Sequence, residues 1–145
     1  QLKKFRILAK KQKGRQSSFM KNLHLGTSAL VVFSAALVYG ANPEGTLPMF
    51  FEFTVENLEL KNIFRAIMGL YLAFAVYWVI GIKKTEHWRN ATLSNVIFMG
   101  GLAFGRLLST LLDGVSIPYT IGFSLEFLVM VWGIYNLKKD NLQAR

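Results

Sequence analysis

The chain has 145 residues, of which 52% are hydrophobic and only 17% are charged. Soluble domains usually carry about 25% charged residues, so this chain lacks the polar surface of an ordinary soluble domain. The absence of cysteine excludes a disulfide framework, a thiolate metal site and a thiol nucleophile. The length allows one domain at most. The net charge is +9, and its distribution along the chain is informative.

Four apolar runs have roughly the length of about 20 residues at which a helix crosses a bilayer. They are residues 23–41, 63–82, 93–112 and 119–137. A soluble four-helix bundle would need a polar outer face on each helix, whereas the second and fourth runs are apolar nearly all round. The sequence therefore predicts an all-α, integral membrane, four-helix transmembrane bundle.

The apolar runs also divide the chain. Residues 22–138 form the predicted four-helix domain. A basic tail precedes it at 1–21, and a short end follows it at 139–145. The longest connection, 42–62, joins the first run to the second.

Lysine and arginine are distributed unequally about the runs. Fourteen of the 17 lie in the tail, between the second and third runs, or at the C-terminal end, whereas the connection at 42–62 has only Lys61 and four glutamates. Since cytoplasmic segments are rich in Lys and Arg, both termini are predicted to be cytoplasmic. Met20-Lys21-Asn22 resembles a bacterial start, which points to a multi-pass protein of the bacterial inner (cytoplasmic) membrane.

The connection at 42–62 mixes bulky apolar side chains with glutamate. Its proline residues end the preceding helix. We expect Met49, Phe50, Phe51 and Phe53 to face lipid or a groove. The segment is then either a lid over a cavity or a loop resting on the membrane surface.

Ionisable residues inside spanning segments are costly, and by default they mark a functional site. Arg65, Arg106 and Glu126 lie within the runs, and Asp113 ends the third run. Counting about 1.5 Å per residue places all four in the outer half of the membrane. We expect Glu126 to pair with Arg106, and Arg65 to reach Glu126 or Asp113.

The spacing of the third run supports this network. A helical stripe of alternating three- and four-residue steps faces the bundle interior. Its members are Asn95, Met99, Leu102, Arg106, Ser109 and Asp113. Three interpretations stay open: a structural network that fixes helix register, a pocket that binds a small oxygen-bearing ligand through arginine, or a proton path.

Small residues that let helices approach closely are the usual packing sites in membranes. Gly101, Gly105 and Ser109 follow one another at four-residue steps, and Gly69 offers a similar site in the second run. They predict helix packing, with the third helix at the centre of the bundle.

Two segments resemble a known family. Residues 64–71 (FRAIMGLY) and 101–109 (GLAFGRLLS), followed by Asp113-Gly114 and Glu126, are similar to the bacterial four-helix family called domain of unknown function 4345. The resemblance covers roughly residues 20–138 and implies a compact four-span membrane protein. It singles out Arg65, Arg106, Asp113 and Glu126 and implies no activity. The expected shape is distantly similar to that of DoxX-like four-helix proteins.

No catalytic constellation, metal motif or cofactor motif is visible in the sequence. The first hypothesis is therefore a structural or accessory subunit, associated with another membrane protein or with further copies of itself. The alternative is a binder or enzyme for a small, lipophilic, quinone- or lipid-like ligand in an Arg/Glu-lined pocket open to the outer face. Besides the bilayer, the basic tail is expected to contact anionic lipid or an acidic protein surface, and no nucleic acid.

Overall fold

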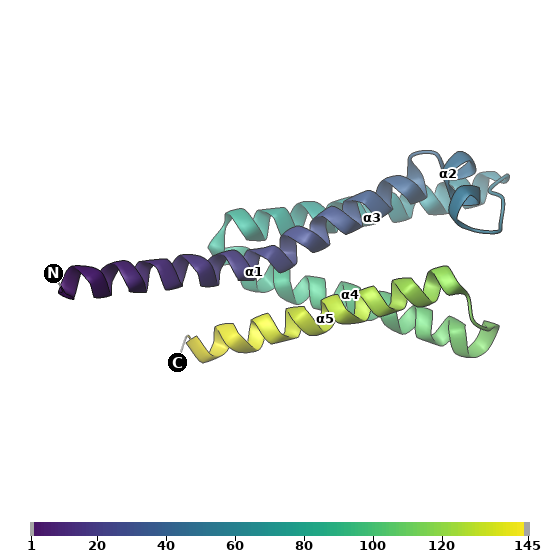
Figure 1. The fold of residues 1–145 in the computed structure, drawn as a ribbon. Helices are drawn as coiled ribbons and strands as arrows, with labels where there is room; N and C mark the ends of the chain where they lie inside the picture. The colour runs from purple at the N-terminus through teal and green to yellow at the C-terminus, as the bar shows by residue number, and fades with distance from the viewer. Residues whose placement is uncertain (1, 144–145) are drawn as a thin grey trace.

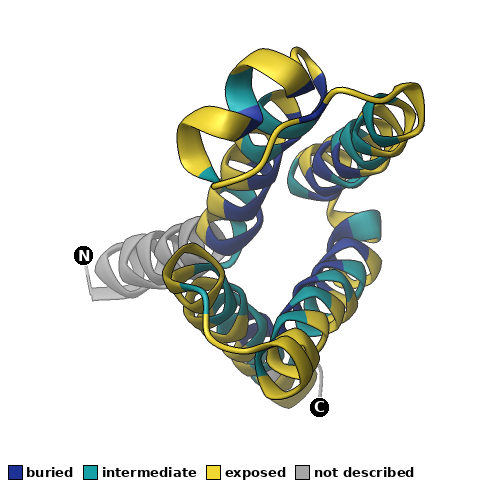
Figure 2. Ribbon diagram, turned by 90° about the vertical axis from the view of Figure 1, so that its right-hand side faces the viewer, coloured by how far each residue is buried: buried dark blue, intermediate teal, exposed yellow. Residues whose placement is uncertain are grey.

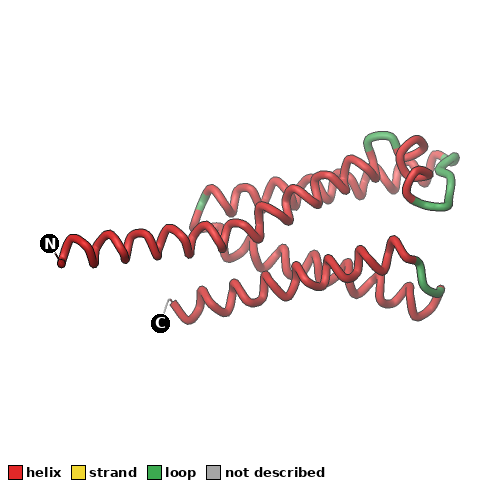
Figure 3. Tube along the Cα trace, viewed as in Figure 1, coloured by secondary structure: helices red, strands yellow, loops and turns green. Residues whose placement is uncertain are grey.

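The computed structural model describes the backbone of residues 2–143 and the side chains of residues 21–142. The described backbone is helical with short connections and contains no strand (Figure 3). Figure 1 shows its helices in chain order: α1 (Leu2–Gly40), α2 (Pro43–Phe50), α3 (Leu58–Lys83), α4 (Thr85–Asp113) and α5 (Ile117–Gln143). Four of them are long and apolar enough to cross a membrane, so the predicted all-α bundle with four candidate spans is confirmed.

The helices extend beyond the apolar runs because hydropathy detects only the part of a helix that would lie in lipid. α3 begins at Leu58, where Asn57 accepts a hydrogen bond from the Leu60 N–H at 2.9 Å and so caps the helix. Lys84 alone separates α3 from α4. The connection at 42–62 also contains a helix of its own, α2, capped by Asn42. The side chains of the basic tail up to residue 20 lie outside the described ones, and so does the partner surface predicted there.

Both ends of the chain lie at the same end of the bundle, which we call the terminal end (Figure 1). α2 and the short turn between α4 and α5 lie at the opposite end, which we call the connection end. Gly114 forms that turn with a φ of 106°, a left-handed conformation that glycine adopts without strain.

The long helices form two pairs. α1 packs mainly on α3, and α4 packs mainly on α5. The pairs meet along α3 and α4 and approach most closely toward the terminal end, whereas they diverge toward the connection end (Figure 1). At the terminal end Lys21 of α1 forms an ion pair with Asp140 of α5 and lies 5.0 Å from the Trp88 ring of α4.

Figure 2 shows buried residues mainly on the helix faces toward the middle of the bundle and exposed residues mainly on the outside. Leu25, Val32, Trp78 and Met99 belong to the buried core. Most of the large apolar residues elsewhere on the long helices remain exposed, including Leu111 at 73%. An apolar outer surface suits helices that face lipid, and the fold is that of a multi-pass membrane protein.

Candidate functional site

An ion pair joins α4 to α5 in the half of the bundle nearer the connection end. Arg106 Nε donates hydrogen bonds to both carboxylate oxygens of Glu126, at 2.9 and 2.8 Å. The side chains of Arg106 and Glu126 are only 19% and 13% exposed. Arg106 lies about 10 Å from the end of α4, and Glu126 about 13 Å from the start of α5. The pairing predicted from sequence is therefore present.

Two further residues of α5 shape the surroundings of Arg106. The Arg106 guanidinium carbon lies 5.3 Å from the centre of the Tyr119 ring, within the range of a cation–π interaction. A Cβ atom on Gly122 would come within 3.1 Å of the guanidinium, so glycine leaves room for it there. Tyr119, Gly122 and Glu126 share one face of α5, because they are spaced by three and four residues.

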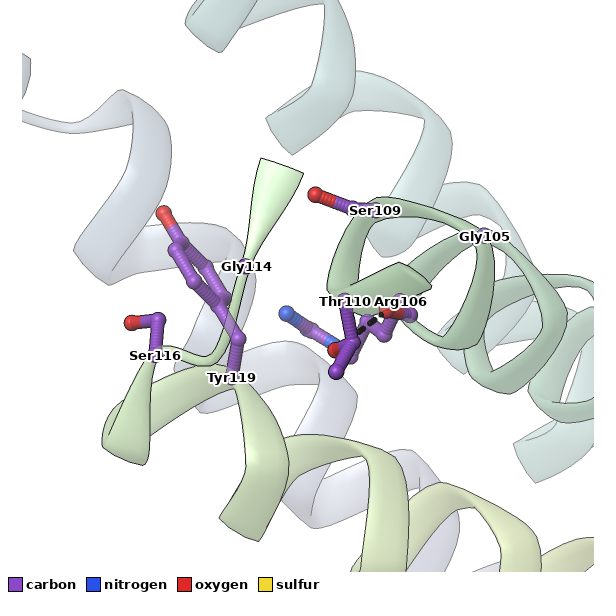
Figure 4. A pocket seen from close by; sticks show the side chains of 7 residues that line it. All are labelled: Gly105, Arg106, Ser109, Thr110, Gly114, Ser116 and Tyr119. Atoms are coloured by element: carbon purple, nitrogen blue, oxygen red, sulfur yellow. Dashed lines mark hydrogen bonds between the residues drawn. The ribbon is translucent and has the colours of Figure 1, made fainter. Parts of the chain in front are cut away.

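A hollow of about 190 Å³ opens beside this pair at the connection end of α4 and α5. Figure 4 shows Arg106 extending from α4 toward Tyr119 across it. Polar groups and glycines supply the rest of the lining: Gly105, Ser109, Thr110, Gly114 and Ser116. The Thr110 hydroxyl donates to the Arg106 backbone carbonyl at 2.9 Å, which fixes one wall of the hollow.

Aromatic rings connect this hollow to the other helix pair. Phe51, just after α2, stacks on Tyr119 at 5.2 Å and on Tyr39 of α1 at 6.5 Å. Of the four bulky residues expected in this connection, Met49 and Phe50 are 78% and 59% exposed, Phe53 is 37% exposed, and Phe51 is partly buried. Phe51 thus lies over the space between the two pairs.

The segment that carries Phe51 is anchored on α1 and α3. The Thr46 hydroxyl of α2 donates to the Val38 carbonyl of α1 at 2.6 Å, and Leu47 is fully buried. Glu44 forms an ion pair with Lys61 of α3. The hydrogen bond and positive charge of Lys61 lower the pKa of the Glu44 carboxyl.

Two predicted members of the polar network lie elsewhere. Arg65 is exposed on the outside of α3 and makes no ion pair with the side chains of residues 21–142, so its predicted contact with Glu126 or Asp113 is wrong. It lies on the face of α3 turned away from α4. Asn95 lies about 16 Å along α4 from Arg106, and it is fully buried nearer the terminal end.

Ser109 and Asp113 lie at the rim of the site. The Ser109 hydroxyl lines the hollow and donates to Asp113 Oδ2 at 3.0 Å. Asp113 is exposed at the end of α4 and reaches neither arginine within the described side chains. The structure therefore brings together Arg106 and Glu126, with Ser109 and Asp113 beside them.

The glycines predicted to pack helices are not the ones that do so. A Cβ atom on Gly69, Gly101 or Gly105 would meet nothing within 4 Å, because the neighbouring helix of the bundle is too far away. Close packing occurs at other glycines instead. A Cβ on Gly81 would lie 2.3 Å from Ala91 Cβ, and one on Gly133 would lie 2.6 Å from Val96.

Tyr119 and Gly122 were not among the residues predicted to form the site. The spacing of three and four residues that puts Tyr119 and Gly122 on the same face of α5 as Glu126 could have indicated them. Phe51 was expected only to face lipid or a groove, and Tyr39 was not predicted at the site, because their approach to it depends on how the two helix pairs are placed. The described side chains form no group of three or more His, Asp and Glu residues that could hold a metal ion.

Residues 20–137 match the model of the family described as Domain of unknown function (DUF4345). The chain belongs to the DUF4345 family. The matched range covers the first three candidate spans and most of the fourth, and it includes the Arg106–Glu126 pair and every residue that lines the hollow. No curated protein and no solved structure matches the chain. The family resemblance seen in the sequence is thereby confirmed, whereas the likeness to DoxX-like proteins stays a prediction.

Proposed function

We propose that this DUF4345 protein binds a small, lipophilic, oxygen-bearing molecule in the hollow beside Arg106. The observation that carries the proposal is the arrangement of the guanidinium. Glu126 engages its Nε, while the terminal nitrogens extend toward the hollow (Figure 4). An arginine fixed in this way offers planar, directed N–H donors to a ligand oxygen.

The local charge favours a neutral carbonyl group over a free anion. Arg106 is neutralised by Glu126, and Asp113 adds a negative charge near the rim through Ser109. The other lining residues of the hollow are uncharged. A polarised quinone or ester oxygen can accept from the guanidinium without adding a second negative charge. The aromatic rings of Tyr119 and Phe51 provide an apolar wall for the rest of such a molecule.

Native mass spectrometry of the purified protein with two probes tests this proposal. The probes are a short-chain quinone and a fatty acid of similar length. We expect the quinone to bind more tightly than the fatty acid. The Arg106→Leu/Glu126→Leu double variant should lose binding by roughly tenfold to a hundredfold, as expected when a charge-assisted hydrogen bond of about 1.5–3 kcal/mol is removed.

Arg65→Leu is the matched control, because it removes an arginine from a spanning helix outside the site. Its binding should equal that of the original protein. Binding of neither probe, or equal loss in Arg65→Leu, contradicts the proposed site. The double variant is preferred to a single one because it leaves no unpaired charge in the bundle.

The orientation proposed for the protein places both termini in the cytoplasm of a bacterial cell and the hollow at the outer face. The support is the excess of Lys and Arg at the terminal end. Since the chain has no cysteine, single substitutions give clean labels. With a membrane-impermeant maleimide on intact cells, Glu56→Cys should react and Asn141→Cys should not. The reverse pattern would show the opposite orientation.

A second candidate function is a structural subunit of a larger membrane complex. It is favoured by the open faces at Gly101 and Gly69, where a further helix would meet no obstacle. Native mass spectrometry from mild detergent would then show a stoichiometric protein partner or a second copy. Gly101→Leu should release that partner without unfolding the protein, and a monomer in the original protein counts against this candidate.

A further inference from the structure

A second group of polar side chains is buried near the terminal end of the bundle, far from Arg106. His24 of α1 and Asn95 of α4 are fully buried, and Asn136 of α5 is 5% exposed. Asn95 lies about 15 Å along α4 from its terminal end, and Asn136 about 10 Å along α5 from Gln143. His24 reaches the same level, because a Cβ atom on Gly133 would lie 3.1 Å from its ring. They therefore occupy one level of the bundle, on three different helices.

Packing contacts connect these helices at that level. The His24 ring lies edge-on to Trp132 at 5.2 Å. A Cβ atom on Gly133 would lie 3.1 Å from the His24 ring and 2.6 Å from Val96, the residue after Asn95. Asn136 lies one helical turn further along α5. The absence of a side chain on Gly133 lets both the imidazole of α1 and Val96 of α4 approach α5 at this level.

The hydrogen bonds of His24 define which ring nitrogen carries the proton. Nε2 lies 3.1 Å from the Val129 carbonyl oxygen, which can only accept, so Nε2–H donates and the neutral ring has an unprotonated Nδ1. That Nδ1 is buried and has no partner among the described residues. This nitrogen can accept a hydrogen bond or a proton, and the described residues provide no donor for it.

The two asparagines have the same deficit. Neither the Oδ1 nor the Nδ2 of Asn95 has a partner in the described part of the chain, and the Asn136 Nδ2 has none. Buried polar groups in proteins are nearly always hydrogen-bonded to protein or to ordered water. An amide left without partners inside a membrane bundle is especially unfavourable. Several such groups at one level indicate that water satisfies them.

This level is separated from the Arg106 site by apolar side chains. Met99 and Ala103 lie between Asn95 and Arg106 on α4, and Val32 and Ala36 face the same layer from α1. On the terminal side the next groups are charged: Lys21 of α1, paired with Asp140 of α5. The buried face of α4 has Trp88 there and no charged residue. The Trp88 indole N–H also has no partner among the described residues. From α3, the buried Trp78 and Gly81 carry no charge.

We propose that His24, Asn95 and Asn136 line a second site that holds ordered water and exchanges protons with the solution at the terminal end. A proton from this water adds to the lone pair of Nδ1, and the resulting Nδ1–H donates to water or to the Asn95 carbonyl oxygen. The Nε2–H bond to Val129 is kept in both states. Water reaches the site past the Lys21–Asp140 pair.

Nitrogen-15 NMR of histidine-labelled protein in lipid bilayers tests this proposal. His24 and His87 are the two histidines of the chain, and His87 is partly exposed on α4, so His87→Gln leaves His24 as the sole signal without touching the site. We expect magnetisation transfer from water to the His24 ring. Nδ1 should become protonated reversibly as the pH falls from about 8 to about 4, a range that brackets ordinary imidazole titration. A ring without water contact, or one whose Nδ1 stays unprotonated throughout, overturns the proposal.

A pair of asparagine variants then locates the water. Asn95→Leu fills the site with an apolar side chain of similar size and should abolish water transfer to His24. Asn90→Leu makes the same change at an exposed position of α4 and should leave that transfer intact. Equal transfer in both variants would also overturn the proposal. The measurement on His87→Gln stands by itself if Asn95→Leu does not fold.

Discussion

Phe51 stacks on Tyr119 with ring centres 5.2 Å apart and planes inclined by 15°. Tyr119 in turn lies over the guanidinium of Arg106. A residue of the long connection, anchored on α1 and α3, therefore contacts the helix that carries Glu126. This contact joins the two helix pairs at the connection end, where their backbones diverge.

Replacing Phe51 tests whether this contact stabilises the bundle. Phe51→Ala should lower the free energy of unfolding in detergent by about 1 kcal/mol or more, because an aromatic pair contributes about 0.5–1.5 kcal/mol beyond its buried area. Phe50→Ala, one residue earlier and 59% exposed, should have a smaller effect. Thermal unfolding in the same detergent compares the two, and equal losses would show that Phe51 has no special role.

The Arg106–Glu126 pair should show strong coupling. Glu126→Leu leaves an arginine of low exposure without its partner and should destabilise the protein by about 3–5 kcal/mol. Adding Arg106→Leu should recover most of that loss, because both charges are then gone. Unfolding measurements on the two single variants and the double variant give the coupling energy. Additive effects would mean that the two side chains do not interact in the membrane.

The effect of a glycine substitution on stability should depend on whether that glycine contacts a neighbouring helix, and not on whether it belongs to a small-residue motif. Gly81→Ala places a methyl group 2.3 Å from the Ala91 Cβ, which is fixed to its backbone, so α3 and α4 must move apart. We expect a loss of about 1–3 kcal/mol. Gly101→Ala meets nothing within 4 Å and should be neutral or stabilising by about 0.5–1 kcal/mol through helix propensity. Thermal unfolding of both variants distinguishes this order from the opposite one that the sequence motif suggests.

The ion pair between Glu44 and Lys61 should make the attachment of α2 to α3 depend on pH. The pKa of Glu44 is lowered, chiefly by its hydrogen bond to Lys61. A lowered pKa in the folded protein contributes stability above the ordinary pKa of glutamate, about 4.3. That contribution is lost as the pH falls through the lowered value.

Glu44→Gln should therefore melt slightly below the original protein near pH 7 and equal to it in strong acid. The effect should be small because the carboxylate is at the surface. Glu56→Gln, at an exposed position of the same connection, is the control and should show no such difference. A Glu44→Gln difference that persists in strong acid would assign the effect to something other than this ion pair.

The candidate site could be predicted in part. Arg106 and Glu126 were identified because charges are costly in lipid and because both lie at the same depth when residues are counted along straight helices. Arg65 likewise lies in the half of the bundle nearer the connection end, but depth says nothing of which way a side chain faces. Arg65 lies on the outside of α3 and is not part of the helix face that packs against α4.

Apolar run length and the spacing of charged residues determined the four candidate spans and the pairing of Arg106 with Glu126. These features depend on local chain geometry and on the cost of charge in lipid, which act on any arrangement of the helices. The tertiary structure alone decided which glycines touch a neighbour, that Phe51 covers Tyr119, and that His24 is buried beside α5. Those contacts depend on the divergence of two helix pairs, and that divergence is set by side-chain packing between residues distant in sequence.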